Sequence, residues 1–216
     1  MSLADCQKDE FGSKEIGPWT EWQGNLDAEL MIVGQEWGGS DNYENQKGCD
    51  RDRDDTNANL VELLGAIDRR IELPSKYQKK KKKKPEQPHY FTNAVLCLRR
   101  GNATASETID KNGKEPALAC FRNCACKFLK PQVDIVHPRV IVSLGYLAYK
   151  AVLFSFDHAV RPERTMRGAL RKGKIPMGSV QLVPMFHCGA RSTKMNRTLE
   201  EQKQDWQSVR DALEPQ

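Results

Sequence analysis

The sequence predicts an α/β protein, a three-layer α/β/α sandwich with a central four-stranded parallel sheet. Short apolar runs bounded by glycine, proline or polar residues have the length of buried strands. Four such runs are present: Leu30–Val33, Tyr90–Leu96, Val140–Leu144 and Val180–Phe186. Helix-like segments lie between them, and this alternation of strand and helix is typical of parallel sheets. Any site is therefore expected at the carboxyl ends of the strands.

Three segments carry helix signals. Residues 57–67 place five apolar side chains at helical spacing, and residues 146–154 directly follow Gly145. The last helix should begin at a capping box, in which the side chain of Thr198 accepts from the amide of Glu201 and the side chain of Glu201 accepts from the amide of Thr198. Its apolar stripe consists of Leu199, Trp206, Val209 and Leu213.

Length and composition indicate a single folded domain over residues 1–216. Hydrophobic residues make up 38% and charged residues 29%, which is not the profile of a disordered chain. No apolar run approaches the ~20 residues of a membrane span, and the N-terminus lacks an apolar signal segment. We therefore expect a cytoplasmic monomer that does not contact a membrane. The net charge of +5 favours a polyanionic partner.

Two polar stretches are predicted to be loops, residues 38–55 and residues 76–88. Both are expected to be mobile, and the second contains six consecutive lysines at 79–84. Such a run is either a solvated, self-repelling loop or an arm that contacts phosphates. Both interpretations remain open.

Three motifs end or follow predicted strands. Gly34-Gln35-Glu36-Trp37-Gly38-Gly39 follows the first strand, Thr92-Asn93 lies in the second, and His187-Cys188-Gly189 ends the last. Because the carboxyl ends of parallel strands share one edge, these motifs should converge. No Gly-Lys-Ser/Thr follows the first motif, which disfavours a nucleotide-binding P-loop.

These motifs, in this order, resemble those of the uracil-DNA glycosylase superfamily, with the bacterial family 4-like branch nearest. LMIVGQEWGG resembles its first motif, and YFTNAVLCLRRGN resembles its Thr-Asn strand. CKFLKPQVDIVHPRVIVSLGYLAYKAV resembles its Leu-Gly-x-x-Ala segment. FHCGAR stands where the family has a His-Pro-Ser type motif, and this departure leaves the substrate range and the rate open.

The resemblance implies a base-excision repair enzyme that flips a damaged nucleotide out of DNA and hydrolyses its N-glycosidic bond, with uracil as the base. His187 would stabilise the departing base, and Glu36 would position water or stabilise the sugar cation. The substrate-binding residues implied are Gly34, Gln35, Trp37, Tyr43 and Asn93.

Within this set, Asn93 would read the base, and either Trp37 or Tyr43 would stack on it. Gln35 is an alternative to Glu36, although an amide is not a base. Arg191, Lys194 and Met195 would follow His187 in a loop that contacts DNA. Met195 or Arg191 would be the wedge in the duplex.

The seven cysteines do not show the spacing of a secreted disulfide framework. Cys97 and Cys124 match two of the four ligands of the family's [4Fe–4S] cluster, but the N-terminal Cys-x-x-Cys pair is missing. We therefore expect no cofactor and no metal. Cys120, Cys124 and Cys126 then fit as small apolar residues on a helix.

Three alternatives remain. The protein acts on another lesion, such as hypoxanthine, xanthine or a mismatched base; or it is a catalytically silent module that only binds DNA; or it is an α/β domain of unrelated small-molecule function. Glu36 argues against the silent module, because a carboxylate near phosphates does not help a binder.

Overall fold

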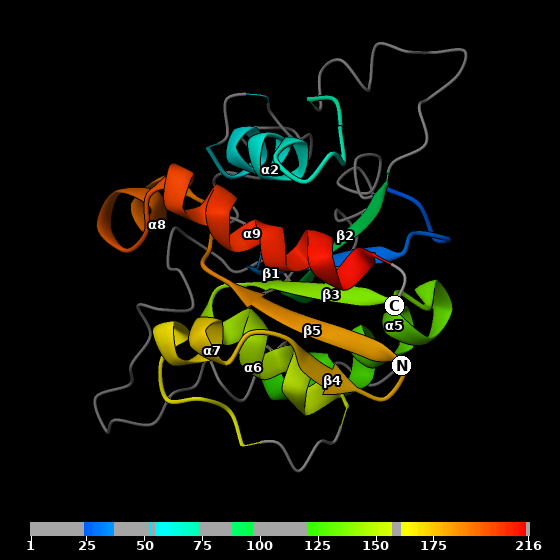
Figure 1. Cartoon of the computed structure of the whole chain (residues 1–216). Coiled ribbons are helices and arrows are strands. Elements are labelled where there is room, and N and C mark those ends of the chain that lie inside the picture. The colour runs from blue at the N-terminus through cyan, green and yellow to red at the C-terminus, as the bar shows by residue number, and fades with distance from the viewer. Residues whose placement is uncertain are drawn as a thin grey trace, which may run out of the picture.

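The computed structural model describes residues 24–36, 52, 55–73, 88–96, 121–156 and 161–214. These residues form a five-stranded sheet with helices on both faces, in the strand order β2-β1-β3-β5-β4 (Figure 1). The strands are β1 (Leu30–Glu36), β2 (His89–Val95), β3 (Val140–Leu144), β4 (Ile175–Met177) and β5 (Val180–Met185). The predicted three-layer α/β sandwich is confirmed.

The predicted number of strands is wrong by one. The four predicted strands are present and parallel, and β4 adds a fifth that pairs antiparallel with β5. β4 has three residues with Pro176 in the middle. Such a segment is too short for an alternating pattern, and proline is confined to positions such as the edge strand that it occupies here. Its short length explains why the strand was not predicted from the sequence.

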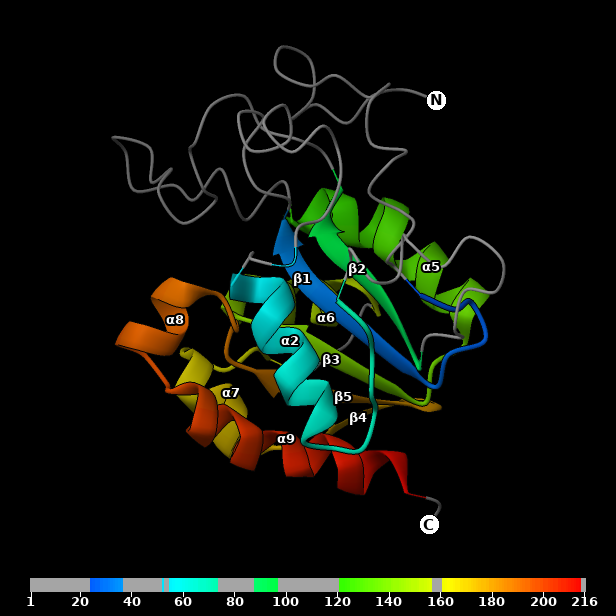
Figure 2. The same ribbon diagram turned by 90° about the horizontal axis from the view of Figure 1, so that it is seen from above.

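The helices of the described part cover the two faces of the sheet (Figure 2). α2 and α9 lie on one face, while η3, α5, α6 and α7 lie on the other. Their bounds are α2 Asp55–Gly65, η3 (a π-helical turn) Ala125–Leu129, α5 Lys130–Val136, α6 Tyr146–Ser155, α7 Met166–Lys172, α8 Ala190–Met195 and α9 Leu199–Leu213. None of the described helices is long and apolar enough to cross a membrane.

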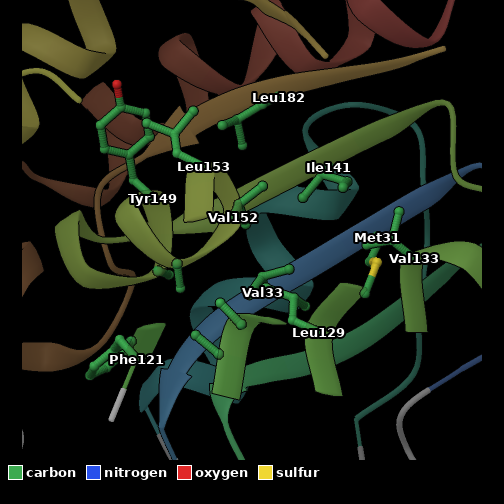
Figure 3. Packing of buried hydrophobic residues seen from close by; sticks show 14 of the residues in the cluster. Met31, Val33, Phe121, Leu129, Val133, Ile141, Tyr149, Val152, Leu153 and Leu182 are labelled. Carbon is green, nitrogen blue, oxygen red and sulfur yellow. The ribbon is translucent and has the colours of Figure 1, made fainter. Parts of the chain in front are cut away.

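Alternate residues of β1 supply the two cores. Met31 and Val33 face η3, α5 and α6, and Figure 3 shows this packing around Val152 of α6. Leu30 and Ile32 face α2 and α9, where Trp206 is completely buried. Both faces of the strand are apolar, as a central strand of a parallel sheet requires.

The capping box predicted for the last helix is confirmed. The Thr198 side chain accepts from the amide of Glu201 over 3.3 Å, and the amide of Thr198 donates to the carboxylate of Glu201 over 2.8 Å. The predicted stripe is buried except for Leu199, which is half-buried. α9 therefore starts at a defined residue, directly after the segment that follows His187.

The helix predicted over residues 57–67 begins two residues earlier, at Asp55, and ends at Gly65. An acidic residue in the first turn suits the positive end of a helix, which explains the earlier start. The predicted loop over 38–55 is thus corrected at Asp55. Its remaining residues, apart from Asp52, and the lysine run at 79–84 lie outside the described residues.

Candidate active site

Four strand ends bring the predicted motifs to one edge of the sheet. β1 ends with Gly34, Gln35 and Glu36, and Asn93 of β2 is paired in register with Gly34. β3 ends next to Gly145, and β5 leads into His187. β1 pairs with β3 only as far as Val33, but with β2 as far as Glu36. The last residues of β1 therefore extend beyond β3 at this edge.

Gly34 and Asn93 fit together because residue 34 has no side chain. A Cβ at Gly34 would lie 2.2 Å from Oδ1 of Asn93, closer than any contact between non-bonded atoms of this kind. Asn93 is only 4% exposed. The carboxamide of Asn93 is therefore held against the backbone of β1, with its orientation restricted by burial.

Gly145 brings Gln35 and His187 together. Its φ of +92° suits glycine, and a Cβ there would lie 3.2 Å from Oε1 of Gln35 and 3.4 Å from Cβ of His187. Its amide donates to the carbonyl of Met185 over 2.7 Å, which ties the end of β3 to the end of β5. Gln35 and His187 therefore both lie against the position where any other residue at 145 would carry its Cβ.

His187 is held as a neutral hydrogen-bond donor. The amide of Gly189 donates to Nδ1 of His187 over 2.9 Å, so the proton of the neutral ring lies on Nε2. Burial lowers the pKa of His187 below its ordinary value of 6.5, which disfavours the charged ring. The imidazole can therefore donate one hydrogen bond from Nε2 without carrying a charge.

α2 fixes the backbone that follows His187. The side-chain amide of Asn59 donates to the carbonyl of Cys188 over 2.6 Å, and the Cys188 thiol contacts the carbonyl of Thr56 over 3.5 Å. Burial raises the pKa of the Cys188 thiol to about 12, so it stays protonated and is not a nucleophile. Cys188 therefore has a packing role where the resembled motif has proline.

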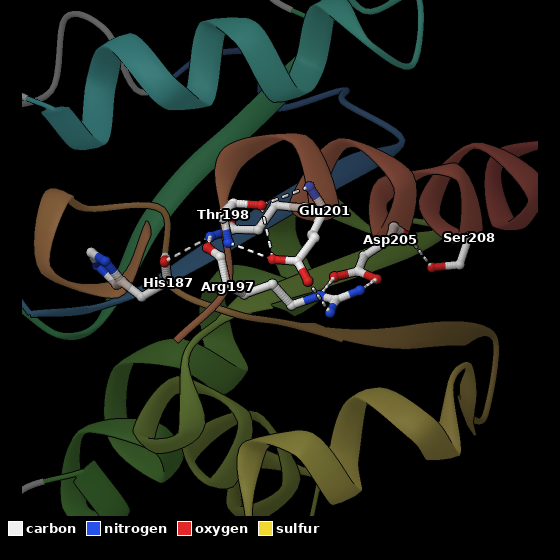
Figure 4. Close-up of polar contacts among 7 residues, drawn as sticks. His187, Arg197, Thr198, Glu201, Asp205 and Ser208 are labelled. Atoms are coloured by element: carbon white, nitrogen blue, oxygen red, sulfur yellow. Dashed lines mark hydrogen bonds and ion pairs between the residues drawn. The ribbon is translucent and has the colours of Figure 1, made fainter. Parts of the chain in front are cut away.

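Gln202 of α9 connects both ends of the segment that carries α8. Its Nε2 donates to the carbonyl of Arg197 over 3.0 Å and to the carbonyl of His187 over 3.4 Å (Figure 4). Arg197 in turn forms a two-pronged ion pair with Asp205. The ring of His187 points away from α9, so this network holds the backbone of the histidine and not its ring.

Gln202 was missed by the sequence prediction. It stands one residue after Glu201 of the capping box and is 1% exposed. A buried glutamine on the apolar side of an amphipathic helix is the signal that could have found it, since buried polar groups need partners.

The predicted DNA-contacting residues lie on a helix, not in a loop. Arg191, Lys194 and Met195 belong to α8, where all three are exposed, and Met195 is 72% exposed. Three small or hydroxyl-bearing residues among its first four gave no apolar periodicity, so the helix had no sequence signal. The roles of the three in binding DNA stay predictions.

Several predicted residues cannot be placed. Trp37, Tyr43 and Cys97 lie outside the described residues. Cys124, the second matched cluster ligand, is 1% exposed and packs among the apolar side chains beneath α6. Within the described ranges no three His, Cys, Asp or Glu side chains are grouped as a metal site. The expectation that the protein has no iron–sulfur cluster stays a prediction.

The sequence model of the uracil DNA glycosylase superfamily matches residues 21–210, which include all four strand ends of the site. The chain belongs to the uracil DNA glycosylase superfamily. No curated protein sequence matches it significantly. Membership supports a DNA glycosylase, a hydrolase with DNA as its substrate, and the resemblance drawn from the motifs is confirmed at this level. The branch within the superfamily stays a prediction.

Proposed function

We propose that this superfamily member releases uracil from DNA by hydrolysing the N-glycosidic bond of a nucleotide flipped out of the stack. The observation that carries the proposal is the neutral His187, fixed by Gly189 as an Nε2 donor and placed beside Gln35 at the strand ends. An excised base must be extruded, because its sugar bond cannot be reached within the duplex.

The leaving group explains the need for a neutral donor. Uracil departs as an anion, with charge developing on its O2. A donor aimed at that oxygen stabilises the transition state more than the ground state, and only this difference accelerates the reaction. His187 provides such a donor from Nε2, and the backbone at Gly34 and Gln35, beyond the end of β3, is our candidate for the remaining donors.

Asn93 supports uracil as the base. Its carboxamide presents one donor and one acceptor, which match O4 and N3–H of uracil. Burial and contact with Gly34 limit the ways in which this group can turn. A base with the opposite pattern would leave buried groups unpaired, at about 1–3 kcal/mol for each.

Glu36 is our candidate for the water-positioning group. It is the last residue of β1 and is half-buried, at the same edge as His187 and Asn93. A carboxylate there can orient water toward C1′ or stabilise positive charge on the sugar. Gln35, although adjacent, cannot accept a proton from water, so its proposed part is restricted to contact with the base.

A substrate panel tests the proposal. Single- and double-stranded oligonucleotides carrying uracil, hypoxanthine, xanthine or thymine are incubated with the protein, and abasic sites are revealed by alkali cleavage. We expect strand breaks only with uracil. Cleavage at hypoxanthine or xanthine alone would assign a different lesion, and binding without any cleavage would make the protein a silent module.

A further inference from the structure

Residues 161–174 form a strongly basic segment in the described part of the chain. It contains one acidic residue, Glu163, and six basic residues, all of them exposed: Arg161, Arg164, Arg167, Arg171, Lys172 and Lys174. Six positive charges and one negative give a net charge of +5, the same as that of the whole chain, with its 34 basic and 29 acidic residues. This segment and the lysine run at 79–84 are two strongly basic stretches of the chain, and of the two only residues 161–174 lie among the described residues.

The segment is anchored beside the candidate active site. The hydroxyl of Tyr146 donates to the carbonyl of Glu163 over 2.7 Å, and the hydroxyl of Tyr149 accepts from the amide of Glu163 over 3.2 Å. Tyr146 directly follows Gly145, the glycine that Gln35 and His187 approach. In Figures 1 and 2, α7 lies on the same side of the molecule as α8. The basic segment thus starts one tyrosine side chain from the site.

Among the described residues the six charges have few acidic partners, although Arg167 interacts electrostatically with Glu201. Among the described carboxylates, only Glu163 forms an ion pair with the six, through Lys172 over 3.5 Å. Arg167 and Arg171 lie four residues apart on α7, on one face of the helix, where like charges repel and weaken it. Exposed arginines with few acidic partners among the described residues fit an anionic partner.

We propose that the exposed face of residues 161–174 binds the phosphate backbone of DNA next to the flipped nucleotide. The location beside the base rests on the proposed function, but the charge argument needs only DNA as partner. Guanidinium groups match phosphate oxygens with paired donors, and each phosphate contact releases condensed counterions. The surface would hold the strand in position while the base enters the site.

Salt-dependent binding tests the proposal. The variant Arg167→Gln/Arg171→Gln is compared with Arg70→Gln/Arg210→Gln, which removes the same charge from exposed positions after α2 and in the last turn of α9. The affinity for a lesion-free duplex is measured by fluorescence anisotropy between about 50 and 200 mM NaCl. We expect the slope of log K against log salt to flatten by about 0.9 for each lost contact, or about 1.8 for the first pair. The control pair should keep the wild-type slope.

Two further variants complete the test. Arg167→Lys/Arg171→Lys keeps the charges and should keep the slope. Arg164→Gln lies before the N-cap of α7, so it tests the surface without touching the helix, with an expected flattening of about 0.9. Equal slopes for the α7 pair, the control pair and Arg164→Gln would overturn the proposal. Because the duplex carries no lesion, a failure of uracil excision alone would overturn the proposed function and leave this result standing.

Discussion

The amide of Gly189 donates to Nδ1 of His187 over 2.9 Å, and this bond fixes which ring nitrogen carries the proton. The two residues are close because position 189 has no side chain: a Cβ there would lie 3.0 Å from Nδ1 and 3.1 Å from Cε1 of the ring. The same Cβ would lie 3.0 Å from Oγ1 of Thr56 in α2. Where the resembled motif has serine, glycine here allows the imidazole to lie over the turn.

Replacing Gly189 should therefore displace the ring. In Gly189→Ala the new methyl group is confined between His187 and Thr56, so the ring or the turn must shift by a few tenths of an ångström. We expect single-turnover uracil release to slow by about 10-fold, since small misplacements of a catalytic group are costly. The affinity for lesion-free DNA should stay unchanged.

Gly65→Ala is the matched control. Apart from its chain neighbours and the backbone of its own helix, no described atom lies within 4 Å of a Cβ at Gly65, which ends α2. The protein should therefore keep its rate and at least its wild-type stability. A Gly189→Ala protein as fast as Gly65→Ala would show that the ring's contact with residue 189 does not matter for catalysis.

Gln202 should affect the rate more than the stability. Gln202→Met removes the donors to His187 and Arg197, but it also removes a buried Oε1 that accepts no hydrogen bond from the described residues. These effects oppose each other, so the free energy of unfolding should change by less than about 1 kcal/mol. The single-turnover rate should fall by about 10-fold, because the backbone of His187 loses its tie to α9.

Chemical denaturation and single-turnover kinetics measure the two effects separately. Gln204→Met, at an exposed position of the same helix, should change neither quantity. If Gln202→Met unfolds more readily while keeping its full rate, Gln202 supports the fold and does not position His187.

The sequence predicted the fold well because local patterns encode most of it. The fully apolar runs around Ile32 and Val142 predict buried parallel strands, and Thr198 with Glu201 predicts the start of α9. β4 was missed because three residues around Pro176 carry no periodicity. α8 was missed for the same reason.

The site was predicted in part. Strand order along the chain was enough to bring Gly34, Asn93 and His187 to one edge. The partners of His187 depend on tertiary geometry: the Gly189 amide is aligned by a turn, and Gln202 reaches back over 15 residues. No local pattern specifies such contacts.

His89 should make the protein less stable in acid. This histidine starts β2, is completely buried, and burial lowers its pKa from 6.5 to about 4. Below pH 6.5 the unfolded chain binds a proton that the folded chain does not, so the free energy of unfolding falls as the pH drops toward 4. The loss should reach roughly 3 kcal/mol from this residue.

Urea unfolding of wild type and His89→Gln between pH 7 and 4 measures this contribution. The curve of the variant should be shallower over that range. Parallel curves would mean that the pKa of His89 does not differ between the folded and the unfolded protein, contrary to what its burial requires.

Asn93 should discriminate between bases by its single donor and single acceptor. Asn93→Asp keeps the shape but replaces the donor with a carboxyl, which accepts from N4–H₂ of cytosine and, if protonated, donates to N3. The variant should lose uracil excision and gain slow release of cytosine from single-stranded DNA. Asn93→Ala should show the loss without the gain, and a full uracil rate in Asn93→Asp would show that this residue does not read the base.

The most direct test of the account is the rate of uracil release from a single-stranded oligonucleotide under single-turnover conditions, for wild type and His187→Ala. Because the neutral imidazole acts on charge that develops only in the transition state, the variant should be slower by about 100-fold or more. Its affinity for the same DNA should be nearly that of the wild type. Equal rates, or a wild-type protein that releases no uracil, would contradict the account.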